Sequence, residues 1–462
     1  MSPKMHFVKC LLKIVFLTLY VGMATAQDFD HYFTLEEMPD AGVFLPAPPA
    51  FESVAFADDF QQWQWGKTVR NTERGKIASR DSEFGIGCMA DIFGQVLGIS
   101  ISQDGTPAIW RLMWRTGTTG RYSVTNAKEK YMRTRPFAKM NEHVFGEFDD
   151  EESLRDNGSY PSGHTAFGWS VALALAEMAP EYQDEILRRG YQYGESRVIV
   201  GAHWQSDVDA ARLAVAAALA RLHTSVEYWH DLASARQEFV RIKNLAVKPA
   251  TEPYPDGVFI MGPPVDTASS RYISDIAQYW LAKNERDSER GRQAIIDADV
   301  SDIALMNCFS PYLALHLSTE NTPAIALLVA EAKKILLQES QRMKSLTFRK
   351  RPFVQLGEKT LIPQDEETNV NTSSYPSSSA AIGWGLALFL AEVAPEHQDN
   401  LLKRGFEYGR SRVIAGYHYA SDVQAGRIMA SYVYTQMHND PKYQKLIENA
   451  KTEYNRKTSL QH

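Results

Sequence analysis

The sequence predicts an all-α protein made of two tandem helical-bundle units, and three observations support this prediction. Apolar positions recur at three- and four-residue steps in the longer segments. No run of alternating β-branched residues is bounded by hairpin turns. The second half of the chain repeats the first half at an offset of 215 or 216 residues.

The length and composition are those of a globular protein with more than one core. A chain of 462 residues is long for one hydrophobic core and suits two domains with a leader. The residues are 44% hydrophobic and 23% charged, and the net charge is −7. Because no basic block is present, we expect no nucleic-acid partner, and any phosphate chemistry must use a few placed cations.

The first 26 residues are typical of a secretory signal peptide. Lys4 and Lys9 supply positive charge around the start of an apolar run from Leu11 to Met23, and Ala24-Thr25-Ala26 offers a small-residue cleavage site. The run is short for the roughly 20 residues of a spanning helix, which disfavours an uncleaved anchor. No later segment reaches about 18 uninterrupted apolar residues, so we expect an exported protein without a membrane span after signal cleavage.

The two cysteines that would remain after cleavage are Cys88 and Cys308. One disulfide between them is possible, but two isolated cysteines are more often small buried hydrophobic residues. No cluster of cysteine and histidine has zinc-like spacing, so we expect no metal site.

The internal repeat defines the domain organisation. Between residues 176–212 and 391–427, 23 of 37 positions are identical. This predicts a tandem duplication, with one unit at 27–236 and a second at 256–462. The charged, polar stretch 237–255 is the expected linker. We expect the two units to pack as an intramolecular pseudo-dimer, and the sequence leaves a further homo-oligomer open.

Each unit contains recognisable helices. Residues 166–179 and 380–394 are apolar almost all round, as a central buried helix would be. Residues 181–194 and 396–409 place apolar residues at helical spacing and finish at a glycine, which predicts a helix end there. Residues 207–223 continue with small and apolar residues at three- and four-residue steps.

The stretch Gly158–Thr165 is a Gly/Ser/Pro-rich loop that leads into the first central helix. Backbone N–H groups at a helix start point outward and favour an anion. A histidine at this corner, His164, can give a proton to whatever anion binds. The loop predicts an anion site with its own acid.

Three clusters of polar residues follow one another in the first unit. In chain order they are Lys128 with Arg135, then Ser162, Gly163 and His164, and then Arg197, His203 and Asp207. Two arginines and a lysine that converge form a site for a tetrahedral oxyanion. His203 and Asp207 are four apart and would share a helix face, so the carboxylate can orient one ring nitrogen while the other attacks.

Each cluster alone has a simpler interpretation. A His-x3-Asp pair is usually a surface pair, and residues 128–139 could be a solvated helix face. The three clusters in this order are what favours catalysis, with His203 as the nucleophile and His164 as the acid that protonates the departing oxygen.

Together the clusters resemble the signature of the type 2 phosphatidic acid phosphatase superfamily, Lys-x6-Arg-Pro, Pro-Ser-Gly-His and Ser-Arg-x5-His-x3-Asp. The stretch Gly158–Thr165 is similar to the bacterial class A non-specific acid phosphatases. The resemblance implies an all-helical fold, a periplasmic location, an acidic pH optimum and no metal or other cofactor. It also implies hydrolysis of small-molecule phosphate monoesters through a phosphohistidine. By the same resemblance, the phosphate ligands are Lys128, Arg135, Ser162, Gly163 and Arg197, and the catalytic residues are His164, His203 and Asp207.

The second unit departs from this pattern at one loop. It retains Lys344, Arg351, Ser377, Arg412, His418 and Asp422. Ser378 replaces the glycine, and Ser379 replaces the acid histidine. A serine hydroxyl is too weakly acidic to protonate a leaving alkoxide, so we predict that this unit binds phosphate but turns over poorly. That the unit survives only as a packing partner is an equally open alternative.

Two other functions remain open at this point. The same superfamily includes vanadate-dependent haloperoxidases, and a phosphate- or phosphoester-binding protein with vestigial catalysis would fit the second unit better than the first. Membrane phosphatases of the superfamily carry several spanning helices, which this chain lacks. The sequence does not identify the substrate, but Tyr122, Tyr160 and Trp204 are candidates for the mouth of the site.

Overall fold

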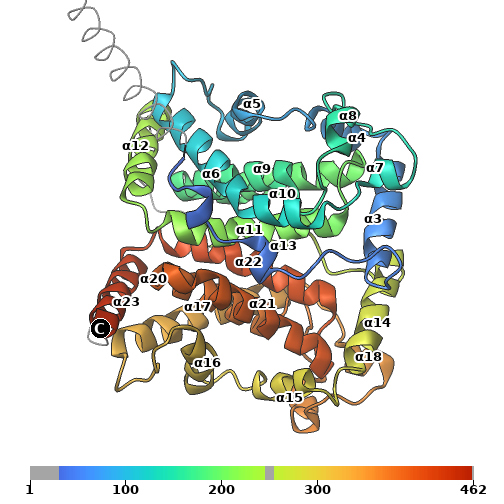
Figure 1. Ribbon diagram of the computed structural model, residues 1–462, viewed down its shortest axis with the longest axis vertical. Helices are drawn as coiled ribbons and strands as arrows, with labels where there is room; N and C mark the ends of the chain where they lie inside the picture. Colours follow the sequence, from blue (N-terminus) through green and yellow to red (C-terminus); the bar gives the residue numbers. More distant parts are fainter. Residues whose placement is uncertain (1–30, 245–253, 460–462) are drawn as a thin grey trace, which may run out of the picture.

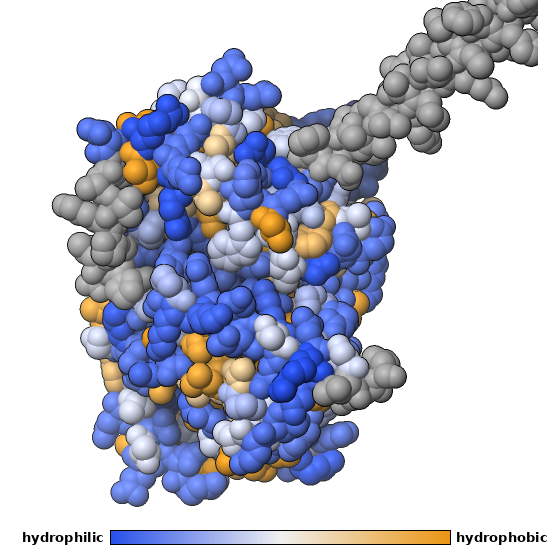
Figure 2. All heavy atoms as spheres, turned by 90° about the vertical axis from the view of Figure 1, so that its left-hand side faces the viewer, coloured by the Kyte–Doolittle hydropathy of each residue, from blue (hydrophilic) through white to orange (hydrophobic). Residues whose placement is uncertain are grey.

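The computed structural model describes residues 31–244 and 254–459 (Figure 1). Within these ranges every regular element is a helix, so the predicted all-α fold is confirmed. The expected signal peptide at 1–26 lies outside the described residues. No helix in the described ranges is long and apolar enough to cross a membrane. The face that carries α12 and α23 is largely hydrophilic, with small apolar patches (Figure 2).

The two halves of the chain contain matching series of helices. In the first half they are η1 (Leu35–Glu37), α2 (Ala41–Phe44), α3 (Phe56–Val69), α4 (Glu73–Arg80), α5 (Ile86–Leu97), α6 (Pro107–Tyr131), α7 (Pro136–Lys139), α8 (Glu151–Arg155), α9 (Gly163–Met178), η2 (Pro180–Tyr182), α10 (Gln183–Ile199), α11 (Gln205–Leu222) and α12 (Val226–Lys243). In the second half they are α13 (Gly257–Met261), α14 (Ser270–Lys283), α15 (Glu289–Ile296), α16 (Asp302–Phe309), η3 (Ser310–Tyr312), α17 (Pro323–Leu346), α18 (Pro352–Leu356), η4 (Pro363–Asp365), α19 (Glu366–Asn369), α20 (Ser378–Val393), η5 (Pro395–His397), α21 (Gln398–Ala415), α22 (Ala420–Met437) and α23 (Pro441–Ser459).

The central helix of each half is buried on all sides, as its composition predicts. Every residue of α9 from Thr165 to Met178 is buried, and so is every residue of α20 from Ala380 to Val393. Removing this apolar surface from water on every side is the main stabilisation of each bundle. Helix α9 packs against α6, α10 and α11, which carry Lys128, Arg197 and Asp207.

The predicted helix ends at glycine are wrong. Helix α10 continues past Gly194 to Ile199, and α21 continues past Gly409 to Ala415. A Cβ added at Gly194 would lie 3.0 Å from a Thr165 methyl group on α9. The glycine therefore serves close helix packing here, and it does not end the helix.

The two halves pack against each other along α11 and α22, which lie side by side through the middle of the molecule (Figure 1). Helix α11 also contacts α20, and α22 contacts α9. Buried apolar residues of both halves form one continuous core. The contact is therefore extensive and apolar.

Short helices at the start of each half cross over to the other half. Helix α2 packs on α21, and α13 packs on α10. The backbone N–H of Asp40, which caps α2, donates to Asp399 on α21 at 3.0 Å. The backbone N–H of Asp256, which caps α13, donates to Asp184 on α10 at 2.9 Å. This reciprocal pair gives the contact an approximate two-fold symmetry.

The expected linker at 237–255 begins inside a helix. Helix α12 continues to Lys243 and ends where Asn244 adopts a left-handed conformation, at φ 50°. The charged composition of this stretch reflects an exposed helical face at its start. Residues 245–253 lie outside the described ranges.

Neither described cysteine is bridged. Cys88 is buried in α5, as expected of a small hydrophobic residue, and burial raises the pKa of its thiol to about 11. Cys308 in α16 is only partly buried.

Candidate active site

The predicted loop does lead into a helix start. Helix α9 begins at Gly163, and the Ser162 hydroxyl caps it by accepting a hydrogen bond from the Thr165 N–H at 3.2 Å. His164 lies in the first turn, and its Nε2 is 3.1 Å from the Ser82 carbonyl oxygen. Since a carbonyl can only accept, Nε2 carries a hydrogen and donates in this arrangement.

The structure brings the predicted cations together around His203. Lys128 comes from the last turn of α6, Arg135 caps α7, and Arg197 comes from the last turn of α10. Lys128 Nζ donates to the Gly158 carbonyl in the loop before α9. Arg135 Nη1 lies 2.9 Å from Nε2 of His203. Arg135 and Arg197 are both buried. Arg135 therefore does not lie on a solvated helix face, which was the alternative for residues 128–139.

The contact between His203 and Asp207 forms differently from the prediction. The two residues do not share a helix face, because His203 precedes α11, whose cap is Trp204. Asp207 lies in the first turn, where its Oδ2 accepts the Trp204 N–H at 2.8 Å and lies 3.5 Å from His203 Nδ1. A helix start therefore turns the carboxylate back toward the imidazole.

The hydrogen-bond partners define what each nitrogen of His203 can do. A guanidinium only donates, so Nε2 accepts from Arg135 and is the unprotonated ring nitrogen that carries the lone pair. The hydrogen of the neutral ring is then on Nδ1, the nitrogen that faces Asp207. This is the tautomer that a nucleophilic Nε2 requires.

Arg197 has an acidic neighbour that the sequence did not indicate. Its Nη2 donates to Asp149 Oδ1 at 2.6 Å, and both side chains are buried. Its Nε and Nη1 have no hydrogen-bond partner among the described residues. Buried guanidinium N–H groups without partners are suited to an anionic ligand.

The surroundings of both histidines favour the neutral ring. Burial lowers the pKa of His203 well below its usual value, and the positive charge of Arg135 lowers it further. Burial, and then the positive charge of Arg197, does the same to His164. A neutral His203 suits a nucleophile, whereas His164 must gain a proton before it can act as an acid.

We expect a difference between the pH profiles of kcat/KM and kcat. A bound phosphate dianion favours protonated His164, so the pKa of His164 is higher in the complex than in the free enzyme. The basic limb of kcat/KM, which reports the free enzyme, should therefore lie below about pH 6.5 and at lower pH than the basic limb of kcat. Steady-state kinetics on an alkyl phosphate across pH would test this. Coincident basic limbs would contradict it.

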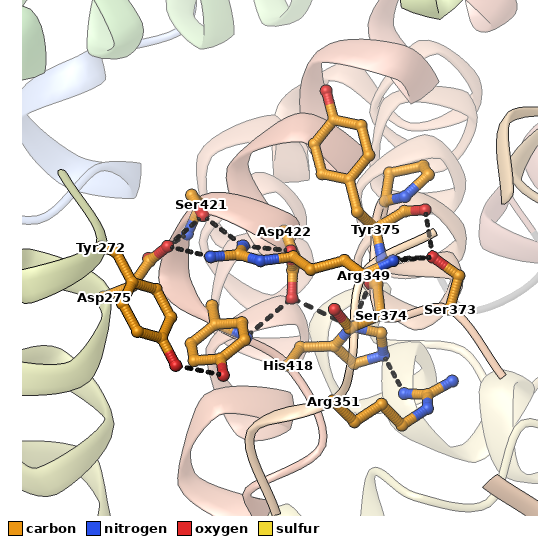
Figure 3. A network of polar contacts seen from close by, with 12 residues as sticks. Tyr272, Asp275, Arg349, Arg351, Ser373, Ser374, Tyr375, His418, Ser421 and Asp422 are labelled. Atoms are coloured by element: carbon orange, nitrogen blue, oxygen red, sulfur yellow. Dashed lines mark hydrogen bonds and ion pairs between the residues drawn. The ribbon is translucent and has the colours of Figure 1, made fainter. Parts of the chain in front are cut away.

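The second half of the chain contains a similar site, with differences at several contacts. Arg351 Nη1 lies 3.1 Å from Nε2 of His418 (Figure 3). Nδ1 of His418 donates to the Ser374 carbonyl at 2.7 Å, and Asp422 Oδ2 lies 3.8 Å from it. Burial, followed by the charge of Arg351, lowers the pKa of His418 to about 3. Lys344 Nζ donates to two loop carbonyls at 2.7 Å. Arg412 Nε and Nη1 lack partners among the described residues, as in the first half.

The loop before α20 carries the main difference. Ser377 caps this helix as Ser162 caps α9, so the helix start is preserved. The hydroxyl of Ser378 accepts a hydrogen bond from Ser340 at 2.7 Å. Ser379, at the position of His164, carries a hydroxyl in place of a titratable ring.

Several residues at the site were missed or misplaced. Tyr160 and Trp204 are buried and donate to backbone carbonyls, so neither lies at the mouth. The exposed aromatic ring beside His164 is Phe84, with ring centroids 4.8 Å apart. Arg133 and Asp59, which support Asp207, were also missed. The available signal was their repetition in the second half, as Arg349 and Asp275.

Comparison with known proteins agrees with this geometry. The profile described as PAP2 superfamily matches residues 112–231 and again residues 323–445. The chain belongs to the PAP2 superfamily. Both matches of this superfamily include the lysine, the arginines and the His-x3-Asp pair of their half.

Several bacterial proteins are similar to part of the chain. The "Non-specific acid phosphatase" of Providencia stuartii is 42% identical over 214 residues, which are 46% of this chain and 86% of that protein. The protein of the same name from Salmonella typhimurium is 40% identical over 237 residues, 51% of this chain and 94% of its own. The "Acid phosphatase" of Zymomonas mobilis is 32% identical over 210 residues, 46% of this chain and 79% of its own. Each of these relatives therefore matches about half of the present chain.

Among the described residues, one group of side chains has ligand atoms close enough together to hold a metal ion. This group lies away from the candidate active site. Glu177, His223 and His438 have donor atoms within 4.8 Å of one another. Glu177 lies at the far end of α9 from His164, roughly 20 Å along the helix. The rings of His223 and His438 are stacked, with centroids 3.8 Å apart, so their in-plane lone pairs do not converge on one point.

Proposed function

We propose that this protein is an exported, periplasmic or secreted acid phosphatase, whose first unit hydrolyses phosphate monoesters through a phosphohistidine without a metal ion. The observation that carries the proposal is the setting of His203. Its Nε2 lone pair faces the Arg135 guanidinium at 2.9 Å, while Nδ1 faces Asp207. The names of the similar proteins from Providencia stuartii and Salmonella typhimurium support the same activity.

The reaction has two halves. Lys128, Arg135 and Arg197 bind the phosphate oxygens, together with the N–H groups at the start of α9. His203 Nε2 then attacks phosphorus, the bond from phosphorus to the ester oxygen breaks, and His164 gives its proton to that oxygen. In the second step of the reaction, His164 takes a proton from water and the water oxygen attacks phosphorus. The bond from phosphorus to His203 then breaks, which releases inorganic phosphate.

We further propose that the second unit binds phosphate and turns over poorly. Lys344, Arg351 and His418 support binding, because they repeat the contacts of the first site. Ser379 cannot supply the proton that an alkoxide leaving group needs. The domain division follows the repeat, with units at 27–236 and 256–462, a linker at 237–255, and a signal peptide at 1–26.

The test of this function is hydrolysis of p-nitrophenyl phosphate and an alkyl phosphate at about pH 5–6, with and without EDTA. We expect both substrates to be hydrolysed at rates that EDTA does not change. Activity that EDTA removes would contradict the proposal. Halide oxidation with added vanadate, in place of hydrolysis, would favour a haloperoxidase, and tight phosphate binding without turnover would favour a binding protein.

A further inference from the structure

We propose that Arg133 and Asp59 are positioning residues for catalysis, which hold the Asp207 carboxylate in the orientation that His203 needs. This inference rests on the proposed roles of His203 and Asp207. Neither Arg133 nor Asp59 faces the phosphate site. They act on the far side of Asp207, through its second oxygen.

Arg133 is held on several sides, so its position is fixed. Its Nη1 donates to Asp207 Oδ1 at 2.6 Å and to the Ser206 hydroxyl at 2.8 Å. Its Nη2 donates to Asp59 Oδ2 at 2.8 Å and to the Pro49 carbonyl at 3.1 Å. Because the guanidinium is planar and rigid, these contacts fix the direction from which it approaches Asp207.

Asp59 is the anchor of this arrangement. It is buried on α3, which is far in sequence from α11, and its carboxylate accepts three hydrogen bonds, one from Arg133 and two from Ser206. Oδ1 accepts the Ser206 N–H at 2.7 Å, and Oδ2 accepts the Ser206 hydroxyl at 2.6 Å. Burial raises the pKa of Asp59 to about 6, although the charge of Arg133 and the hydrogen bond from Ser206 act in the opposite direction. Asp59 therefore ties Arg133 and the first turn of α11 to the same point.

As a result, both carboxylate oxygens of Asp207 accept hydrogen bonds. Oδ1 is bound by Arg133, and Oδ2 is bound by the Trp204 N–H at 2.8 Å. The carboxylate can then present one defined edge of Oδ2 to His203 Nδ1, and it cannot rotate. Supporting contacts of this kind orient a catalytic group and commonly affect activity by about 10–100-fold.

The second half contains the same arrangement, which argues against chance. Arg349 donates to Asp422 at 2.6 Å and to Asp275 at 2.7 Å, and Asp275 accepts from Ser421 (Figure 3). Figure 3 shows the guanidinium of Arg349 between the two carboxylates, with His418 on the opposite side of Asp422. The same side chains therefore support the His-x3-Asp pair at both sites.

The arrangement also has a defined effect on charge. Burial opposes ionisation of Asp207, but the charge and hydrogen bond of Arg133 together with His203 outweigh it and lower the pKa of Asp207 to about 2. The ionisable groups that act on Asp207 or on its neighbours in this arrangement are Arg133, His203, Asp59, Lys128, Arg135 and Tyr160. Removing Arg133 takes away the positive charge that does most to lower the pKa of Asp207, so this pKa rises and the ionised form of Asp207 is lost at higher pH.

The test uses the full chain and compares Arg133→Met, Arg133→Lys and Asp59→Asn with wild type on an alkyl phosphate. We expect Arg133→Met and Asp59→Asn to lower kcat by about 10–100-fold with little change in KM. The acid limb of the kcat profile should move to higher pH in Arg133→Met only, because Asp59→Asn keeps the cation beside Asp207. Arg133→Lys should return the acid limb toward wild type while recovering only part of kcat.

A buried ion pair far from the site serves as the structural control. Arg115 Nη1 pairs with Asp231 at 2.9 Å, and both side chains are buried. Asp231→Asn should lower the melting temperature without changing kcat or the pH profile. If the Arg133 and Asp59 variants lose no more kcat per folded molecule than this control, or lose activity through KM alone, the proposal is wrong.

Two further measurements keep the test decisive. If Arg133→Met does not fold, Ser206→Ala removes one contact to each of Arg133 and Asp59, and it should lower kcat several-fold with KM unchanged. An unchanged kcat in Ser206→Ala together with an unchanged kcat in Asp59→Asn would overturn the proposal. His203→Ala is assayed in parallel, because retained activity in that variant would reject the proposed nucleophile itself, separately from the roles of Arg133 and Asp59.

Discussion

Replacing His203 by alanine is expected to abolish hydrolysis of alkyl phosphates, with a loss on the order of 10⁴–10⁶-fold in kcat. The reason is that His203 alone among the described side chains contacts Arg135 through Nε2 and faces Asp207 with Nδ1 at the first site. Hydrolysis of p-nitrophenyl phosphate should also fall, to the residual rate that the second site supports. Initial rates of both substrates on purified full-length protein would measure this.

The control for this variant is an exposed histidine. His143 pairs with Glu151, and its side chain is 93% exposed, so His143→Ala should keep wild-type rates. Any p-nitrophenyl phosphatase activity that persists in His203→Ala is assigned to the second site, because p-nitrophenolate leaves without a proton. His418→Ala should remove that activity and no other. Wild-type alkyl phosphatase activity in folded His203→Ala would contradict the assignment of the first site.

Restoring the acid in the second unit is expected to create an alkyl phosphatase there. The variant combines Ser378→Gly and Ser379→His in a His203→Ala background, in which the first site is silent. Lys344, Arg351 and His418 are already in place, so the change supplies the missing general acid, which is typically worth about 10²–10⁴-fold in rate. The measurement is alkyl phosphate hydrolysis relative to the His203→Ala protein.

The matched control carries Ser378→Gly with Ser379→Asn, since an asparagine is similar in shape but cannot donate a proton of suitable acidity. It should show no gain. If the histidine variant also shows no gain while it still binds inorganic phosphate, the second unit is impaired for another reason and the proposed role of Ser379 is wrong.

The sequence predicted the buried helices well and their ends poorly. An apolar composition on every side of α9 and α20 leaves no solvated face, so central burial followed directly. Gly194 was interpreted as a helix end because glycine is common there. Its actual role depends on the distance to Thr165 on a neighbouring helix, which no local pattern contains.

The candidate site was predicted in its residues more than in its geometry. The three cations and His203 come together as their motifs suggested. The approach of Asp207 to His203 depends on a helix cap, which four-residue spacing alone does not distinguish from a shared helix face. Asp59 was missed because it lies 74 residues from Arg133 in the chain, and such long-range ion pairs leave no mark on local sequence.

The measurement that tests the central claim most directly is capture of the covalent intermediate. Wild-type protein, reacted with a ³²P-labelled phosphate monoester and quenched with alkali to preserve phosphohistidine, is digested and its labelled peptide is sequenced. We expect label on the peptide that contains His203, and none on that peptide in His203→Ala. Label on another residue, or steady turnover of the wild-type protein with no labelled peptide in rapidly quenched samples, would contradict it.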